Sequence, residues 1–331
     1  MKVWIDACTG KHVRYAWAIA NRLRSLGHKL ILTTRKHPDT TALADILSEE
    51  FTVVGEYDPA SLFTKLQASV KRELSFCQMF KEDAPDLTIS HQSVEACRVA
   101  FGLGMPIIST ADAPHVEAVN KLTLQLVNFL IISKAIPQSH YRSYGVKNIV
   151  QFDGVDEVAW IKGYKPKLNV EEYGKPLIVV RQTETKASYA YGKMDVTEEV
   201  ARKLTSLGQV VFIPRYDKHS RRGLIVPQKL VDSVSLAAKA DLVLSVGGTI
   251  AREAALQGTP SIVIPIIEPK FYYTNNYLSK LGFPLFIVNL SDAMKYAKKY
   301  IGMKWDVKEK FDKLENPVDM IESIVKEGKY D

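Results

Sequence analysis

The residues best placed to do chemistry lie in one stretch, ADLVLSVGGTIAREAALQGTPSIVIP at 240–265. A strand in this stretch runs into a turn and then directly into a helix. The turn carries small residues, Ser245, Gly247, Gly248 and Thr249. Glycines let the backbone approach a ligand, and the free amides of a helix N-terminus favour a phosphate. Glu253, one turn into the helix, is within reach of a ribose hydroxyl, so the stretch predicts a nucleotide-diphosphate site. The alternative is a tight turn that binds nothing.

Arginines close two further strands in the same half of the chain. Arg181 ends the strand expected at 176–182, and Arg215 ends the strand expected at 209–215. Both are candidate phosphate partners, because ligands of parallel sheets gather at the carboxyl ends of strands. For the basic run that begins at Arg215, a solvated loop is the alternative.

A second candidate site follows the first strand of the chain, in the turn DACTGKHV. Gly10, in this turn, is a candidate cleft residue. His12 opens an amphipathic helix and is a candidate general base, since its ordinary pKa suits deprotonation of a hydroxyl at neutral pH. The alternative is a first-turn histidine that only satisfies the loop.

Polar residues also follow the strand at 106–112, in TADAPHVEAVNK. Asp112 and His115 are candidates for proton transfer, and Asn120 lies one helical turn beyond Glu117. A helix N-cap at Asp112 is the compatible structural alternative. No longer-range partners for a zinc ion are evident, so no metal ligands are expected.

Two weaker candidates come from neighbouring segments. His91 ends the strand at 85–91 and could line the same ligand cleft as Asp112. The alternative is a loop histidine whose hydrogen bonds are satisfied locally. Glu157, in FDGVDEVAWI, is a candidate cleft residue, with helix capping as the alternative.

These positions need a scaffold that brings strand ends together, and the chain alternates strands with helices. In the first third, strands are expected at 2–7, 29–35, 51–57, 85–91 and 106–112. Helical segments of ten or more residues between strands indicate βαβ units and a parallel sheet. After a polar stretch at 162–176 the alternation of strands and helices starts again, which predicts two α/β domains.

The glycine turn carries a resemblance to known proteins. SVGGTIAREAALQGTPSIVIP resembles the nucleotide-binding element of GT-B proteins, among them the peptidoglycan UDP-GlcNAc transferase and the non-hydrolysing UDP-GlcNAc 2-epimerases. In those proteins a glycine-rich turn faces the diphosphate, and a glutamate six residues after the first glycine holds the ribose. Gly247 and Glu253 have that spacing.

A closer resemblance spans nearly the whole chain. It is to a mainly archaeal, uncharacterised GT-B-like family, domain of unknown function 354, through MKVWIDACTGKHV, LGHKLILTTR, PDLTISHQS, TADAPHVEAVNKLTL, VQFDGVDEVAWI and GGTIAREAALQGTP. The resemblance implies an α/β protein of GT-B architecture. Two Rossmann-like doubly wound parallel-sheet domains would face each other across a cleft.

The expected domains follow from the restart of the pattern and from that architecture. They are an N-terminal Rossmann-like acceptor domain at 1–162, a linker at 163–176, a C-terminal Rossmann-like nucleotide-sugar-binding domain at 177–316 and a C-terminal helix at 317–331. The last helix has one apolar face. We expect that face to pack back on the N-terminal domain.

The helical stretch at 60–81 carries an apolar stripe beside basic residues. The stripe consists of Leu62, Phe63, Leu66, Val70 and Leu74. Core packing is the expected explanation of such a face, and contact with a lipid-linked acceptor is the alternative.

Composition excludes several classes of protein. With 46% hydrophobic and 24% charged residues in 331, the chain is globular rather than disordered. Its net charge of +7 suits a phosphorylated small molecule, and no RNA- or DNA-binding signature is present, so no nucleic-acid partner is expected. Three scattered cysteines indicate neither a disulfide framework nor a zinc site. With no signal peptide and no transmembrane segment, we expect a cytoplasmic protein, with peripheral contact at the inner face of the membrane left open.

Together these features predict a glycosyltransferase-like enzyme. It would move a sugar from a nucleotide-diphosphate donor, a UDP-sugar, to a small-molecule or lipid-linked acceptor. Neither a metal nor a cofactor is expected, because a helix N-terminus and arginines can stabilise the departing diphosphate. The alternatives are a non-hydrolysing sugar-nucleotide 2-epimerase and a non-catalytic nucleotide-sugar-binding protein.

Overall fold

A computed structural model of the chain describes residues 1–37, 39–165, 173–185, 195–215 and 217–330. The chain divides into two compact units. The first contains Met1–Trp160 and Glu315–Asp331, and the second contains Ile161–Leu314. The stretch expected as a linker at 163–176 falls in the second unit, and its residues 166–172 lie outside the described part.

The first unit is built on a parallel sheet of seven strands in the order β3-β2-β1-β4-β5-β6-β7. The strands are β1 (Lys2–Ala7), β2 (Lys29–Lys36), β3 (Thr52–Glu56), β4 (Leu87–Ser90), β5 (Ile107–Ala111), β6 (Phe129–Ser133) and β7 (Asn148–Phe152). The chain first adds strands on one side of β1 and then returns to the other side at β4. This reversal makes the β1/β4 border the switch point of a Rossmann-type sheet, where ligands of such sheets bind.

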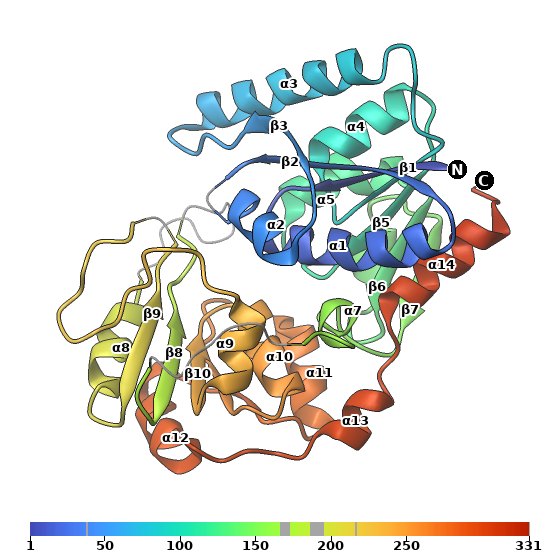
Figure 1. Cartoon of the computed structure of the whole chain (residues 1–331). Coiled ribbons are helices and arrows are strands. Elements are labelled where there is room, and N and C mark those ends of the chain that lie inside the picture. The colour runs from blue at the N-terminus through green and yellow to red at the C-terminus, as the bar shows by residue number, and fades with distance from the viewer. Residues whose placement is uncertain (38, 166–172, 186–194, 216, 331) are drawn as a thin grey trace. The chain divides into compact units, whose positions relative to one another are not determined.

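Helices cover both faces of this sheet. They are α1 (Gly10–Ser25), α2 (Thr41–Leu47), α3 (Leu62–Met79), α4 (Val94–Gly102), α5 (Glu117–Thr123), α6 (Ser139–Arg142) and α14 (Pro317–Glu327), with a short 3-10 helix at Leu124–Leu126. The short helix α7 (Val158–Ile161) spans the division between the two units. α3 packs on α4 and α4 on α5, whereas α1 packs on α2 and α14. Figure 1 shows these two groups on opposite faces of the sheet.

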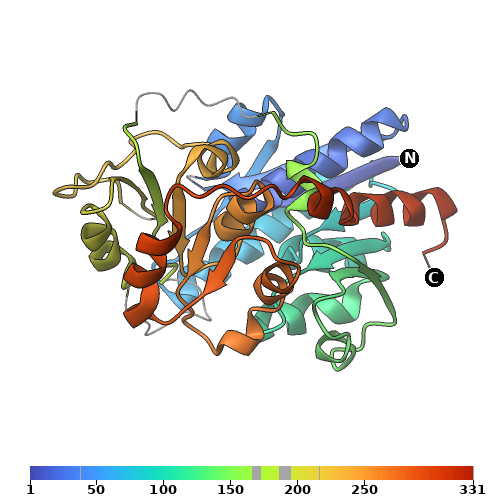
Figure 2. The ribbon, with the colours of Figure 1, turned by 90° about the horizontal axis from the view of Figure 1, so that it is seen from below.

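The C-terminal helix α14 belongs to the first unit, as expected. Asn316 caps its N-terminus by accepting from the Val318 backbone N–H, and Gly328 ends it in the left-handed conformation. Its buried side chains, such as Ile321, lie on the face that contacts α1, β6 and β7. Figure 2 shows the red C-terminal helix beside the blue N-terminal elements. The expected packing of this helix is therefore confirmed.

The second unit has a parallel sheet of five strands in the order β12-β11-β10-β8-β9. The strands are β8 (Leu177–Arg181), β9 (Gln209–Ile213), β10 (Leu242–Ser245), β11 (Ser261–Val263) and β12 (Leu285–Ile287). The helices are α8 (Thr197–Leu204), α9 (Ser233–Lys239), α10 (Thr249–Leu256), α11 (Tyr273–Lys280), α12 (Ala293–Tyr300) and α13 (Lys308–Asp312), with 3-10 helices at Pro269–Phe271 and Leu290–Asp292. Here the reversal falls between β8 and β10, the strands that carry Arg181 and the glycine turn.

No local pattern in the sequence indicates an element between 267 and 316, where the structure has α11, β12, α12 and α13. β12 has only three residues, which is too short to show an alternating pattern. Its Phe286 stacks on Tyr300 of α12, with ring centroids 4.2 Å apart. Aromatic packing between elements, rather than local periodicity, therefore fixes this region.

Helix α3 corrects one expectation. Its apolar stripe does not pack in the core: Leu62 is 87% exposed, Phe63 71% and Leu66 64%. The opposite face is the buried one, through Arg72 and Phe76.

No helix in the described part of the chain is long and apolar enough to cross a membrane.

Candidate functional site

Residues that follow four different strands meet at the carboxyl edge of the first sheet. Lys11 follows β1, His91 follows β4, Asp112 follows β5, and Asp156 follows β7. Since the strands are parallel, their carboxyl ends share one edge, and β1 and β4 border the switch point. We call these four residues the Lys11 cluster.

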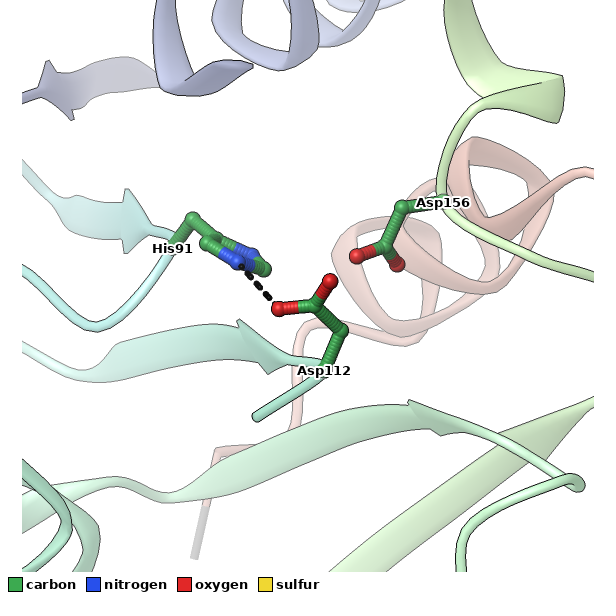
Figure 3. Close-up of side chains that lie close together, drawn as sticks. All are labelled: His91, Asp112 and Asp156. Carbon is green, nitrogen blue, oxygen red and sulfur yellow. Dashed lines mark ion pairs between the residues drawn. The ribbon is translucent and has the colours of Figure 1, made fainter. Parts of the chain in front are cut away.

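Lys11 lies at the centre of the cluster. Its Nζ is 2.5 Å from Asp112 Oδ2 and 2.8 Å from Asp156 Oδ2. It is also 3.3 Å from His91 Nε2, which lies 3.4 Å from Asp112 Oδ1. Figure 3 shows the imidazole and the two carboxylates pointing toward one another. One ammonium thus bridges two largely buried carboxylates, where electrostatic interactions are stronger than in water.

The cluster also has the composition of a divalent-metal site. One ligand atom each from His91, Asp112 and Asp156 lies within 4.8 Å of the others. Imidazole nitrogen and carboxylate oxygen are ligands that zinc and manganese accept. Because Lys11 Nζ already contacts all three side chains, its ammonium stands where such an ion would bind. An ion and the ammonium are alternatives at this position.

The position of His91 is fixed by its neighbours. Its Nδ1 lies 2.7 Å from Thr110 Oγ1. Gln92, the next residue, has a φ of 50°, a conformation that side chains other than glycine rarely adopt. Gln92 donates from Nε2 to Asn120 Oδ1 at 2.7 Å. These contacts turn the chain after β4 and aim the imidazole at the cluster.

His12 lies beside the cluster, with its ring centroid 4.8 Å from that of His91. Burial lowers the pKa of His12 well below its ordinary value, and His91 and Lys11 act in the same direction. His12 Nδ1 accepts from the Cys8 backbone N–H at 3.4 Å. In a neutral ring this places the proton on Nε2, so His12 presents a hydrogen-bond donor rather than a free basic nitrogen.

A buried ion pair holds the loops of this edge together. Arg72 of α3 donates to both carboxylate oxygens of Asp6, at 2.6 and 3.0 Å. Ser93, the N-cap of α4, donates to the same carboxylate at 2.5 Å. Burial by itself would raise the pKa of Asp6, but the charge of Arg72 and the hydrogen bonds outweigh it and lower that pKa. The network joins the ends of β1 and β4, which precede Lys11 and His91.

The other predicted residues of the first unit lie around the cluster. Gly10 begins α1, and His115 lies on the exposed turn before α5. Asn120 is buried and donates from Nδ2 to the Pro114 carbonyl at 3.0 Å, which holds that turn. Glu157 is fully buried next to Asp156.

The structure corrects one structural alternative and leaves another role open. Asp112 does not cap α5, because that helix begins at Glu117 and its N-cap is Val116. Catalysis by His12, Asp112 or His115 stays a prediction.

In the second unit, the glycine turn follows β10 as expected. Ser245 Oγ donates to the Gly247 carbonyl at 2.7 Å and closes the turn. A Cβ placed on Gly247 would meet no atom within 4 Å, so the backbone faces open space. Gly248 is the N-cap of α10 and has no side chain with which to accept from the first helical turn. The amides after Thr249 therefore suit an anion.

Gly248 is required by the side chains packed against it. A Cβ there would lie 1.9 Å from Arg252 Nη1 and 3.1 Å from Asn275 Oδ1. Arg252 is buried, and its Nη1 donates to Asn275 Oδ1 at 2.8 Å and to Thr274 Oγ1 at 3.0 Å. Asn275 Nδ2 is also buried and has no hydrogen-bond partner among the described residues. An unsatisfied buried donor costs free energy, so this amide calls for an acceptor close to the turn.

Glu253 sits deeper than a ribose-binding role suggests. It is buried, and its Oε2 accepts from Ser233 Oγ at 2.8 Å. Ser233 is the first residue of α9, so this bond joins α9 to α10. To contact a ribose, Glu253 would have to share or break this hydrogen bond with Ser233. Ribose binding by Glu253 stays a prediction.

The two predicted arginines lie at the ends of neighbouring strands. Arg181 Nη1 donates to the Pro214 carbonyl at 3.2 Å, and Arg215 Nε donates to the Gln182 carbonyl at 3.0 Å. Arg215 Nη1 also lies 3.7 Å from Glu184 Oε2. Both therefore tie the ends of β8 and β9 together, and their binding to phosphate stays a prediction.

The sequence pattern does not single out Lys11, and it points to Glu157 rather than to its neighbour Asp156. One signal was available for the lysine. Lys11 lies in the first turn of α1, where the helix dipole disfavours a cation, so it needs carboxylate partners from elsewhere.

The two units resemble proteins of known structure. The Methanocaldococcus jannaschii UDP-GlcNAc 2-epimerase in complex with UDP-GlcNAc and UDP matches with a TM-score of 0.70 at 13% identity, over 98% of this chain and 99% of that chain. The Streptomyces nogalater glycosyltransferase SnogD matches with a TM-score of 0.56 at 16% identity, over 98% and 99%. At such identities the likeness shows the fold alone. This chain has the GT-B architecture.

The sequence defines the family more closely. The family described as Protein of unknown function (DUF354) matches residues 1–329, and the chain belongs to it. A relative from Methanocaldococcus jannaschii, "Uncharacterized protein MJ0665", is 28% identical over 338 residues, which cover 97% of this chain and 96% of that protein.

Proposed function

We propose that this protein is an enzyme that acts on a nucleotide-diphosphate sugar, in the first place a metal-independent glycosyltransferase with a UDP-sugar donor. The observation that carries the proposal is the N-terminus of α10. Gly247 faces open space there, Gly248 leaves the first turn without a side-chain cap, and the buried amide of Asn275 lacks a partner among the described residues. All three features favour an anion such as a diphosphate.

Donor binding would belong to the second unit. The amides that follow Gly247 would hold the diphosphate, and Glu253 would accept from a ribose hydroxyl. Arg181 and Arg215 would approach the phosphates from the adjacent strand ends. A helix N-terminus and guanidinium groups can stabilise a departing diphosphate without a divalent ion.

Proton transfer would belong to the Lys11 cluster in the first unit. Asp112 is the best-placed base, because Lys11 orients it and His91 lies beside it. His12 would donate a hydrogen bond from Nε2. His115, which follows Asp112 in the same turn, would contact the acceptor. The acceptor is a hydroxyl compound, small or lipid-linked.

A 2-epimerase is the second candidate. That reaction removes and restores a proton next to the anomeric carbon, so it needs acid and base groups within one unit. Asp112, Asp156 and His91 form such a set.

A thermal-unfolding screen against nucleotide sugars, with and without a chelator, tests the proposal. We expect a UDP-sugar to raise the melting temperature equally in both conditions. The absence of a shift with every nucleotide sugar, or a shift that needs Mg²⁺, would contradict it. Incubation with UDP-GlcNAc and no acceptor then separates the candidates, because an epimerase forms the ManNAc epimer and a strict transferase leaves the substrate unchanged.

A further inference from the structure

Arg35, near the end of β2, differs from three other arginines of the first unit in what its guanidinium contacts. Arg22, Arg24 and Arg72 each form ion pairs with carboxylates. Arg35 is part-buried, and its Nε donates to the Cys8 carbonyl at 2.9 Å. The N–H groups on its Nη1 and Nη2 have no acceptor among the described residues. A guanidinium whose two terminal nitrogens are open suits an oxyanion, which it can bind through two parallel hydrogen bonds.

The side chain of Tyr57 holds this guanidinium in place. Arg35 Cζ lies over the Tyr57 ring, 4.3 Å from its centroid, which is the distance of a cation–π contact. Tyr57 follows β3, and its backbone N–H donates to the Lys36 carbonyl at 3.3 Å, which continues the pairing of β3 with β2. Because Nε is bound to Cys8 and Cζ lies over the ring, the guanidinium is already ordered without a ligand. Binding therefore costs little side-chain entropy.

A second cation shares the same ring. Lys65 Nζ, on α3, lies 5.8 Å from the Tyr57 centroid, and within the described part of the chain it has neither a hydrogen-bond partner nor an ion pair. The acidic neighbours of Tyr57 do not neutralise the two cations. Glu56 and Asp58 form no ion pair with them, and Asp58 Oδ1 accepts instead from a backbone N–H of the next turn. Two cations at one ring favour an anion with more than one negative charge. We call Arg35, Tyr57 and Lys65 the Arg35 group.

The Arg35 group borders the Lys11 cluster. β2 and β1 are neighbouring strands, and the Cys8 carbonyl that accepts from Arg35 belongs to the turn that leads into Lys11. The charge of Arg35 acts on the same edge of the sheet. Burial is the main cause that lowers the pKa of His12, and the charges of His91, Lys11 and Arg35 act in the same direction. A molecule bound to Arg35 therefore lies next to the group proposed as the catalytic base.

We propose that the Arg35 group binds the phosphate of the acceptor, so that the acceptor is a phosphate monoester with a free hydroxyl. A phosphate monoester carries up to two negative charges and three acceptor oxygens, which allows Arg35 and Lys65 to bind it together. A carboxylate carries one charge and would leave one of the two cations unneutralised. The role of the ligand as acceptor rests on the proposed function, whereas the binding of phosphate by the Arg35 group does not.

Inorganic phosphate is the probe, and the imidazole signals of His12 are the readout. The full chain is titrated with phosphate at constant pH and ionic strength, and the signals are followed by NMR, with His12→Gln used to assign them. We expect a saturable shift in the wild type and an affinity at least ~10-fold weaker in Arg35→Gln. Lys65→Gln should cause a smaller loss. Arg24→Gln is the matched control, because Arg24 is already paired with Glu49, and it should bind phosphate as the wild type does.

The conservative variant Arg35→Lys keeps the charge and removes the two parallel donors, so its affinity should lie between those of the wild type and Arg35→Gln. The melting temperature of each variant without phosphate checks that it is folded. The absence of a His12 response in the wild type, or an equal response in Arg35→Gln, would overturn the proposal. A response to acetate as strong as that to phosphate would overturn the assignment to a phosphate.

The readout needs neither a donor nor turnover, which separates this proposal from the proposed function. UDP binding by the second unit can fail while phosphate binding by the Arg35 group holds, and the reverse.

Two further ligands distinguish a free phosphate from a lipid-borne one. Glycerol 3-phosphate is soluble, and vesicles of phosphatidylcholine and phosphatidic acid present the same group at a surface. Binding of glycerol 3-phosphate alone assigns a free phosphate, and tighter binding to the vesicles assigns a lipid-borne one. In both cases Arg35→Gln should bind at least ~10-fold more weakly, and unchanged binding by this variant would overturn the proposal.

Discussion

The two units carry candidate ligand sites of opposite kinds on the same type of sheet. In the first unit, the edge at the switch point carries charged side chains that hold one another: Lys11 bridges Asp112 and Asp156, and His91 lies beside them. In the second unit, the edge carries backbone: an open glycine turn and the uncapped start of α10. A charged cluster suits proton transfer, whereas helix amides suit the binding of a fixed anion. This difference suggests a division of labour, with binding in one unit and chemistry in the other.

The largest effect is expected from Asp112→Asn. The substitution removes the proposed base but keeps the shape of the side chain, so turnover should fall by about 10²- to 10⁴-fold. The rate is measured with whichever nucleotide sugar protects the wild type. Asp153→Asn is the control, because Asp153 lies on the same loop as Asp156 and its side chain is half exposed. Near wild-type turnover in Asp112→Asn would contradict the proposal that Asp112 of the first unit is the catalytic base.

Arg72→Met should have the next largest effect, on stability. It leaves the carboxylate of Asp6 buried without its cation, which lowers the free energy of unfolding by about 3–5 kcal/mol. Arg24→Met is the control, since the Arg24–Glu49 pair is far more exposed and is worth about 0–1 kcal/mol. Urea unfolding followed by tryptophan fluorescence reports on the first unit, which contains Trp4, Trp17 and Trp160. Equal losses in both variants would contradict the special role of the buried pair.

The two glycines of the turn should separate binding from folding. Gly248→Ala pushes a Cβ into Arg252 and should lower the free energy of unfolding by about 1–3 kcal/mol. Gly247→Ala meets open space and should change it by no more than about 0.5 kcal/mol. Both variants should lose protection by the nucleotide sugar. Differential scanning calorimetry with and without UDP measures both quantities, and full protection of Gly247→Ala by UDP would exclude the turn as the diphosphate site.

The smallest effect concerns pH and His12. Its pKa is lowered in the folded state, so below its ordinary value of 6.5 the unfolded chain binds a proton that the folded chain does not. The contribution of His12 to stability is therefore complete above about pH 6.5 and is lost as the pH falls below that value. His12→Gln should flatten this part of the profile. An unchanged slope of melting temperature between pH 7 and pH 5 would argue against a neutral, buried ring.

How much the sequence predicted differs between the two edges. The Ser245–Glu253 element lies within nine consecutive residues, so a local pattern located it. The Lys11 cluster draws on residues 11, 91, 112 and 156, whose meeting depends on strand order and on the turn at Gln92. Strand order follows from tertiary packing, which a pattern of local spacing does not contain. The sequence therefore indicated His91 and Asp112 separately and missed the lysine that joins them.

The fold was predicted well where strands and helices alternate regularly. It was predicted poorly where tertiary packing determines which elements form and which faces are buried. The rhythm of the first third indicated the parallel sheet, and the apolar face of α14 indicated its packing. The exposed face of α3 could not be recognised, because periodicity reveals an apolar stripe but not what covers it. On that helix the buried ion pair of Arg72 with Asp6 determines which face turns inward.

Isothermal titration of UDP into the wild type, Asp112→Asn and Gly247→Ala tests the division of labour most directly. Asp112→Asn should bind UDP within about twofold of the wild-type affinity, whereas Gly247→Ala should bind at least ~10-fold more weakly, a difference of about 1.4 kcal/mol. Equal loss of binding in both variants, or wild-type binding by Gly247→Ala, would contradict it.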